Sequence, residues 1–136
     1  MRSGGARASR SAAIVDVDGD GDLDIVTNEF NAAPQVLVSN LAARRPIHWL
    51  SVALVGTGSN RNGLGATVRV SAGGRTLTEW NDGKSGYLSQ SVLPLYFGLD
   101  QATSVDRVEV DWPSGRKQVV TEGLRANTTI RVVEPR

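Results

Sequence analysis

Apolar and polar residues alternate along most of the chain, the period-two pattern of β-strands with one buried face. Gly73-Gly74 separates two such runs and predicts a tight hairpin turn. The alternating runs lie at residues 50–54, 66–70, 107–112 and 130–132, and further strands are expected at residues 75–81, 93–98 and 116–121. These short strands predict an antiparallel β-sandwich for residues 47–136. No long segment has helical periodicity, so the predicted fold class is all-β.

Residues 11–40 form a smaller piece with the predicted order strand, acidic loop, strand, turn, strand. Three short strands bury little apolar surface by themselves, so we expect this piece to pack on something else. Residues 41–46 are expected to be a linker that ends at Pro46. Residues 1–10 are rich in Arg, Ser, Gly and Ala and lack the apolar region of a secretory signal. We expect them to be a disordered start left by a truncation.

The acidic loop at residues 16–24 is the clearest chemical signal, because an aspartate occupies every second position. A calcium ion prefers six to eight oxygen ligands, and a tightly curled loop points alternate side chains inward. Glycines at positions 19 and 21 allow that curl. The pattern predicts a Ca²⁺ site, and the alternative is a solvated acidic turn. The predicted ligands are the carboxylates of Asp16, Asp18, Asp20 and Asp24 and the backbone carbonyl of Asp22.

An EF-hand begins with the same spacing, but it requires a glutamate at loop position 12, where this chain has Thr27. The β-branched flanks also favour strands over helices. A calcium loop between two strands resembles the FG-GAP/VCBS repeat, whose blades build β-propellers. This resemblance covers residues 11–40 and implies a propeller-blade fragment. Because a propeller needs several blades, we expect the chain to be the C-terminal part of a longer protein with upstream repeats.

A second resemblance rests on four short motifs, at residues 58–68 (GSNRNGLGATV), 86–90 (GYLSQ), 97–99 (FGL) and 110–115 (VDWPSG). Together they resemble the ASPIC/UnbV domain over residues 48–133. That domain follows FG-GAP/VCBS repeats in secreted proteins related to cartilage acidic protein. Considered by themselves, these motifs are typical of fold-defining turns, with Trp112 on the core face.

Several polar and aromatic residues are candidates for a recognition surface. The glycine-flanked loop either defines the fold or presents polar side chains to a ligand. Two aromatic residues either form a platform for sugars or pack between strands. The candidate recognition residues are Ser59, Asn60, Arg61, Asn62, Trp80 and Tyr87.

Composition narrows the possible functions. The formal net charge of +1 gives no reason to expect nucleic-acid binding, and no apolar run is long enough for insertion into a membrane. The absence of cysteine excludes disulfides and thiolate chemistry. The single histidine, His48, and the lack of a Gly-x-Ser-x-Gly motif argue against a serine hydrolase, so we expect no catalytic residues.

We therefore expect a non-enzymatic, calcium-binding β-domain that serves adhesion or recognition of a protein or glycan ligand. The family resemblance implies an extracellular, cell-surface or periplasmic location. Two alternatives stay open. One is a carbohydrate-binding module, and the other is an accessory domain of an enzyme whose catalytic part lies in an upstream propeller.

Overall fold

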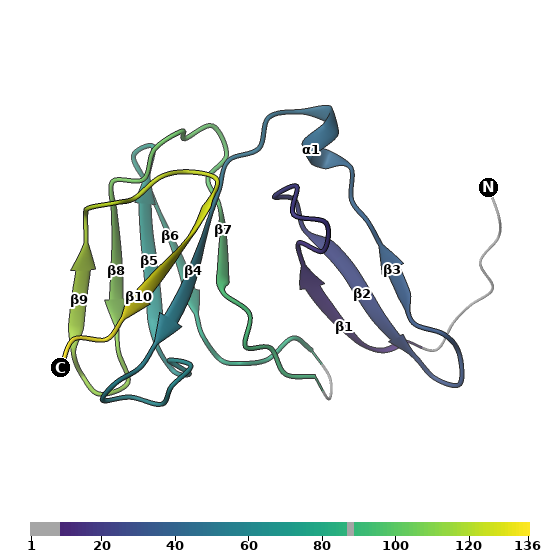
Figure 1. Cartoon of the computed structure of the whole chain (residues 1–136), viewed down its shortest axis with the longest axis horizontal. Helices are drawn as coiled ribbons and strands as arrows, with labels where there is room; N and C mark the ends of the chain where they lie inside the picture. The colour runs from purple at the N-terminus through teal and green to yellow at the C-terminus, as the bar shows by residue number, and fades with distance from the viewer. Residues whose placement is uncertain (1–8, 87–88) are drawn as a thin grey trace. The chain divides into compact units, whose positions relative to one another are not determined.

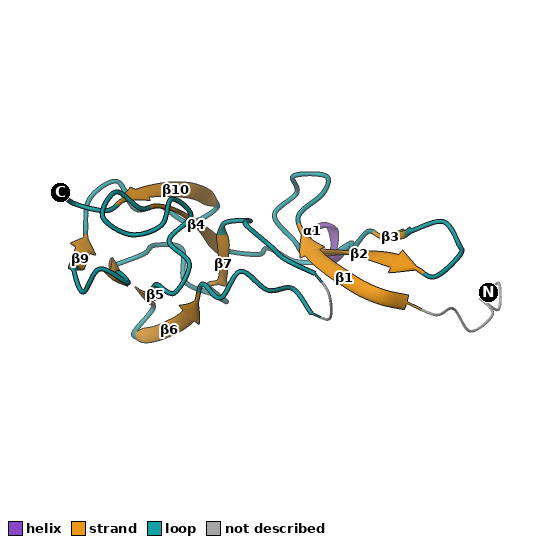
Figure 2. Cartoon of the chain, turned by 90° about the horizontal axis from the view of Figure 1, so that it is seen from below, coloured by secondary structure: helices purple, strands orange, loops and turns teal. Residues whose placement is uncertain are grey.

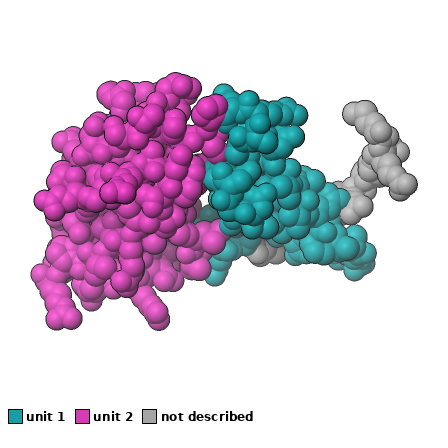
Figure 3. Space-filling view, turned by 45° about the horizontal axis from the view of Figure 1, so that its top comes forward, with its two compact units in different colours: residues 1–45, 83–91 teal, residues 46–82, 92–136 magenta. Residues whose placement is uncertain are grey.

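The computed structural model describes residues 9–86 and 89–136, and regular structure in these ranges is almost entirely β-strand (Figures 1 and 2). The predicted all-β fold class is confirmed. Two compact units can be distinguished (Figure 3): unit 1 comprises Met1–Arg45 and Gly83–Ser91, and unit 2 comprises Pro46–Asp82 and Val92–Arg136. Within the described ranges, no helix has the length and apolar character needed to cross a membrane.

Unit 1 contains an antiparallel sheet of three strands in the order β1 (Ser9–Val15), β2 (Asp24–Glu29) and β3 (Gln35–Leu37). The expected disordered start does not extend to Ser9 and Arg10, because both belong to β1. The Ser9 hydroxyl donates a hydrogen bond to Glu29 Oε1 over 2.8 Å. The expectation also covered residues 1–8, which lie outside the described residues.

The segment expected to be a linker contains a single helical turn, α1 (Leu41–Arg44). The Arg45 N–H closes it by donating to the Leu41 carbonyl over 3.1 Å. Gly83–Ser91 belongs to unit 1, although the predicted sandwich domain extended without interruption over residues 47–136. At the ends of this segment, the Ser91 N–H donates a hydrogen bond to the Gly83 carbonyl over 2.9 Å.

Unit 2 is built from two sheets. One has the strand order β10-β4-β7 and the other β6-β5-β8-β9. The pairing of β10 with β4 is parallel, whereas the other strand pairs in these two sheets are antiparallel. The strands are β4 (Trp49–Val55), β5 (Thr67–Ala72), β6 (Arg75–Trp80), β7 (Leu95–Gly98), β8 (Arg107–Asp111), β9 (Lys117–Val120) and β10 (Thr128–Val133).

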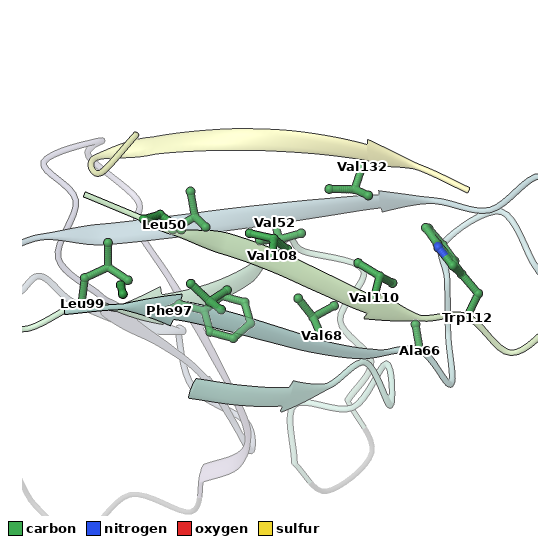
Figure 4. Packing of buried hydrophobic residues seen from close by; sticks show 13 residues of the cluster. Leu50, Val52, Ala66, Val68, Phe97, Leu99, Val108, Val110, Trp112 and Val132 are labelled. Carbon is green, nitrogen blue, oxygen red and sulfur yellow. The ribbon is translucent and has the colours of Figure 1, made fainter. Parts of the chain in front are cut away.

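The core of unit 2 takes apolar side chains from both sheets (Figure 4). The predicted alternation holds: Val68 and Val70 of β5 are fully buried, and so are Val108 and Val110 of β8. Trp112, which directly follows β8, is 3% exposed, as expected for a core residue. Two sheets that bury one common cluster form a sandwich-like domain.

The predicted hairpin turn at Gly73 and Gly74 joins β5 to β6. Both glycines have positive φ, 56° and 74°, as a two-residue hairpin turn with matching strand twist requires. Ala72 pairs with Arg75 directly across the turn. This turn sets the β5–β6 register, and the register determines which side chains of the two strands face the core and which face outward.

Candidate metal site and a buried carboxylate

The loop between β1 and β2 wraps around the carboxylate of Asp16. Its Oδ1 accepts a hydrogen bond from the Gly19 N–H over 2.7 Å, and its Oδ2 accepts one from the Gly21 N–H over 3.0 Å. Both glycines have positive φ, 80° and 90°, where a side chain would be strained. The glycines therefore bring their N–H groups to the first aspartate of the loop.

Asp24, at the start of β2, joins the two ends of this loop. It is only 1% exposed. Its Oδ2 accepts a hydrogen bond from the Val17 N–H and its Oδ1 one from the Ser39 N–H, both over 2.8 Å. This one carboxylate connects the acidic loop with the chain that follows β3.

Three loop carboxylates converge. Asp16, Asp18 and Asp24 each contribute an oxygen, and these oxygens lie within 4.8 Å of one another. Ligands on opposite sides of a calcium ion are separated by about 4.6–5.2 Å, twice the usual Ca–O distance. Carboxylate oxygens are also the ligands that this hard cation prefers. The chemistry and spacing of the three side chains therefore fit a calcium ion.

The other two loop aspartates have different surroundings. Asp20 is exposed, and its Oδ1 accepts the Asp22 N–H over 3.0 Å. That hydrogen bond lowers the pKa of Asp20, but desolvation and the neighbouring loop carboxylates outweigh it and raise the pKa above its usual value. Asp22 is 3% exposed, and its Oδ2 accepts the Ala42 N–H over 2.8 Å. Its Oδ1 is buried without a hydrogen-bond partner among the described residues.

The candidate recognition loop of unit 2 is largely occupied with its own fold. Asn60 both accepts a hydrogen bond from the Leu64 N–H and donates one to the Leu64 carbonyl, each over 2.8 Å. The Asn62 carbonyl accepts the side-chain amide of Asn81 over 2.8 Å. Arg61 is exposed. The asparagines therefore shape this loop.

Ser59, the fourth candidate of that loop, contacts Glu134, a residue that the sequence analysis did not identify. Glu134 is 1% exposed. Its Oε2 accepts the N–H groups of Thr57, Gly58 and Ser59 over 2.7–2.8 Å. Its Oε1 accepts the hydroxyl groups of Ser59 and Ser114. One carboxylate thus connects the loop after β4, the turn after β8 and the end of β10.

These hydrogen bonds control the ionisation of Glu134. Burial raises the pKa of its carboxyl, but the hydrogen bonds from Ser114, Ser59 and Thr57 outweigh burial and lower the pKa from 4.5 to about 2. Strand parity could have revealed this residue. Val132 is buried in β10, and a residue two positions later faces the same side of a strand.

The two aromatic candidates cannot be compared, because Tyr87 lies outside the described residues. Trp80 is the last residue of β6 and is 64% exposed. The other tryptophans pack more closely: Trp112 is buried and donates from Nε1 to Gln118 over 3.0 Å, and Trp49 stacks on a tyrosine ring. Among the tryptophans, only Trp80 presents most of its surface to solvent.

Comparison with known families confirms the predicted resemblance to the ASPIC/UnbV domain. A family model described as ASPIC and UnbV matches residues 56–136, which include the loop after β4, the turn after β8 and Glu134. No curated protein matches the sequence at a significant level.

Proposed function

The chain belongs to the ASPIC and UnbV family, and from this premise we propose that it is a calcium-stabilised, non-enzymatic β-protein of recognition or adhesion. In this proposal unit 1 is a blade fragment of the FG-GAP/VCBS type. The protein acts outside the cytoplasm, at a cell surface, in a periplasm or in the extracellular space, where calcium is abundant enough for weak sites. The observation that carries the proposal is the convergence of the Asp16, Asp18 and Asp24 oxygens within 4.8 Å.

The electrostatics of the loop support a role for a cation. Five carboxylates lie within nine residues, and like charges this close destabilise the folded loop unless they are neutralised. Together with desolvation, this repulsion raises the pKa of Asp20 above its usual value. A bound calcium ion would supply the compensating positive charge. Asp16 and Asp24 are already oriented by backbone N–H groups, so little conformational entropy is lost when they act as ligands.

The hydrogen bonds of Asp24 and Asp22 support a structural role for the loop within unit 1. Asp24 holds the Ser39 N–H, and Asp22 holds the Ala42 N–H. Both donors follow β3 in the chain. Ordering the acidic loop therefore orders the path from β3 into α1. In this proposal the metal is a structural brace, and the protein recognises its ligand through another surface.

Calorimetric titration of calcium into the chelator-stripped full chain tests the proposal. We expect one site per chain, and the double variant Asp18→Ala/Asp20→Ala should weaken binding about tenfold or more, because affinity follows the number of charged ligands. The matched control is Asp106→Ala/Glu122→Ala, which removes two exposed carboxylates outside the loop and should bind as the wild type does. Equal calcium affinity in the loop variant and the control variant, or no binding by the wild type, would refute the calcium site.

A further inference from the structure

We propose that the outer face of the β6-β5-β8-β9 sheet binds a neutral oligosaccharide, with the indole ring of Trp80 as its stacking platform. This deepens the recognition role proposed above by naming a partner. The two proposals rest on different residues, because Trp80 belongs to unit 2 and the acidic loop belongs to unit 1.

Strand register defines this outer face. Val68 and Val70 of β5 point into the core, so the alternate residues Thr67, Arg69 and Ser71 point outward. Their register partners share the outer face. These are Trp80, Thr78 and Thr76 on β6, and Asp111, Glu109 and Arg107 on β8. On β9, Lys117 pairs with Asp111 and Val119 pairs with Glu109, so both also lie on this face.

Trp80 lies at one end of a row that also contains Thr67 and Asp111. An indole ring offers a broad, flat apolar surface at a small cost in side-chain entropy. The C–H groups on one face of a sugar ring form a matching apolar plane, and its hydroxyl groups extend sideways toward polar neighbours. β6 is an edge strand, so no further strand of this sheet flanks Trp80.

Farther along the same outer face, Arg69 and Asp111 hold each other in an ion pair. Arg69 Nη1 lies 2.7 Å from Asp111 Oδ2, and each of these two side chains is only about one-third exposed, 37% and 33%. The hydrogen bond from Arg69 lowers the pKa of Asp111, which keeps the carboxylate ionised. The remaining N–H groups and lone pairs of such a pair can hydrogen-bond to neighbouring hydroxyls of a sugar.

The spacing favours an oligosaccharide over a single sugar. Trp80 and Asp111 lie on strands separated by β5, which places their backbones about 10 Å apart, two interstrand distances. This spacing across the sheet favours a chain of two or more sugars over a single ring.

The charges on this face favour a neutral ligand. The acidic side chains of β8 are already paired: Asp111 with Arg69 and Lys117, and Glu109 with Arg107 at 3.3 Å. A face with internally paired charges gives little attraction for a polyanion. A protein interface usually has a cluster of apolar side chains at its centre. Among the residues of this outer face named above, Val119 is the only aliphatic one.

Titration of the full chain with cellohexaose, xylohexaose and mannohexaose tests this proposal, with heparin and alginate oligosaccharides as acidic probes. We expect at least one neutral oligosaccharide to bind. Trp80→Ala should weaken binding about tenfold or more, and Trp80→Phe, which keeps a smaller ring, should weaken it less. The matched control is Val92→Ala, which changes an apolar residue of unit 2 that is 72% exposed and lies outside this face. It should leave binding unchanged.

Three results would overturn the proposal: no binding of any neutral oligosaccharide, equal binding by Trp80→Ala and Val92→Ala, or binding of the acidic probes alone. The Asp18→Ala/Asp20→Ala variant separates the two proposals. If this variant still binds the oligosaccharide, the sugar site on the sheet face is supported independently of the calcium site. If the wild-type chain binds calcium but none of these oligosaccharides, only the proposed sugar site on the sheet face is refuted.

Discussion

Replacing Asp24 by asparagine tests whether this carboxylate holds the acidic loop together even without a metal ion. The substitution keeps the size of the side chain but converts one acceptor oxygen into an NH₂ group. One of the two donors, the Val17 N–H or the Ser39 N–H, then faces another donor in a site that is 1% exposed. Hydrogen bonds to charged groups contribute about 1.5–3 kcal/mol, and a buried donor without a partner adds a penalty. We expect unit 1 to lose about 2–4 kcal/mol of stability in chelator.

Asp18→Asn is the matched reference. Asp18 is exposed and accepts only one longer hydrogen bond, 3.3 Å from the Asp20 N–H. In chelator this variant should be no less stable than the wild type, because it loses only this longer hydrogen bond and also removes one of the like charges of the loop. Asp18 and Asp24 both belong to the converging carboxylates. Comparing the two variants therefore separates the contribution of Asp24 to folding from its contribution to ion binding.

Urea unfolding followed by far-UV circular dichroism, with amide hydrogen exchange at Val17 and Ser39, measures the effect. The three tryptophans at positions 49, 80 and 112 all belong to unit 2, so tryptophan fluorescence follows unit 2 separately. We expect faster exchange at both amides and an unchanged fluorescence midpoint in Asp24→Asn. Wild-type exchange rates at both amides in this variant would show that the Asp24 carboxylate does not hold the loop.

Two further predictions concern unit 2. The hydrogen bonds that lower the pKa of Glu134 to about 2 stabilise the fold fully above about pH 4.5, and this contribution is lost as the pH falls toward 2. Thermal melts across this range should show a weaker pH dependence for Glu134→Gln than for the wild type; an unchanged dependence would contradict the assignment. Gly63→Ala should cost about 2–4 kcal/mol in urea unfolding, because φ is +64° and an added Cβ would lie 2.9 Å from Leu54 Cβ. Gly74→Ala, which has positive φ but open space, should cost only about 1–2 kcal/mol; equal losses would exclude the contact with Leu54 as the cause.

Local patterns in the sequence were sufficient to predict the strands and their turns. The alternation around Val68 and Val110 defines which face of each strand is buried, because successive side chains point to opposite sides. Gly73 and Gly74 specify their turn because two consecutive positive φ angles are costly for other residues. The acidic loop is a local pattern too: its aspartates and glycines already predict a curled, oxygen-rich loop.

Contacts between residues far apart in the chain were decided only by the tertiary structure. Glu134 accepts hydrogen bonds from the Thr57 N–H, 77 positions away, and no local pattern identifies a donor at that distance. The parallel pairing of β10 with β4 likewise depends on the path of the whole chain. In the acidic loop, the spacing predicted four carboxylate ligands and one backbone carbonyl, and the folded loop brings oxygens of three of those carboxylates, Asp16, Asp18 and Asp24, within 4.8 Å of one another. Sequence determines which groups are available, and the folded backbone decides which of them meet.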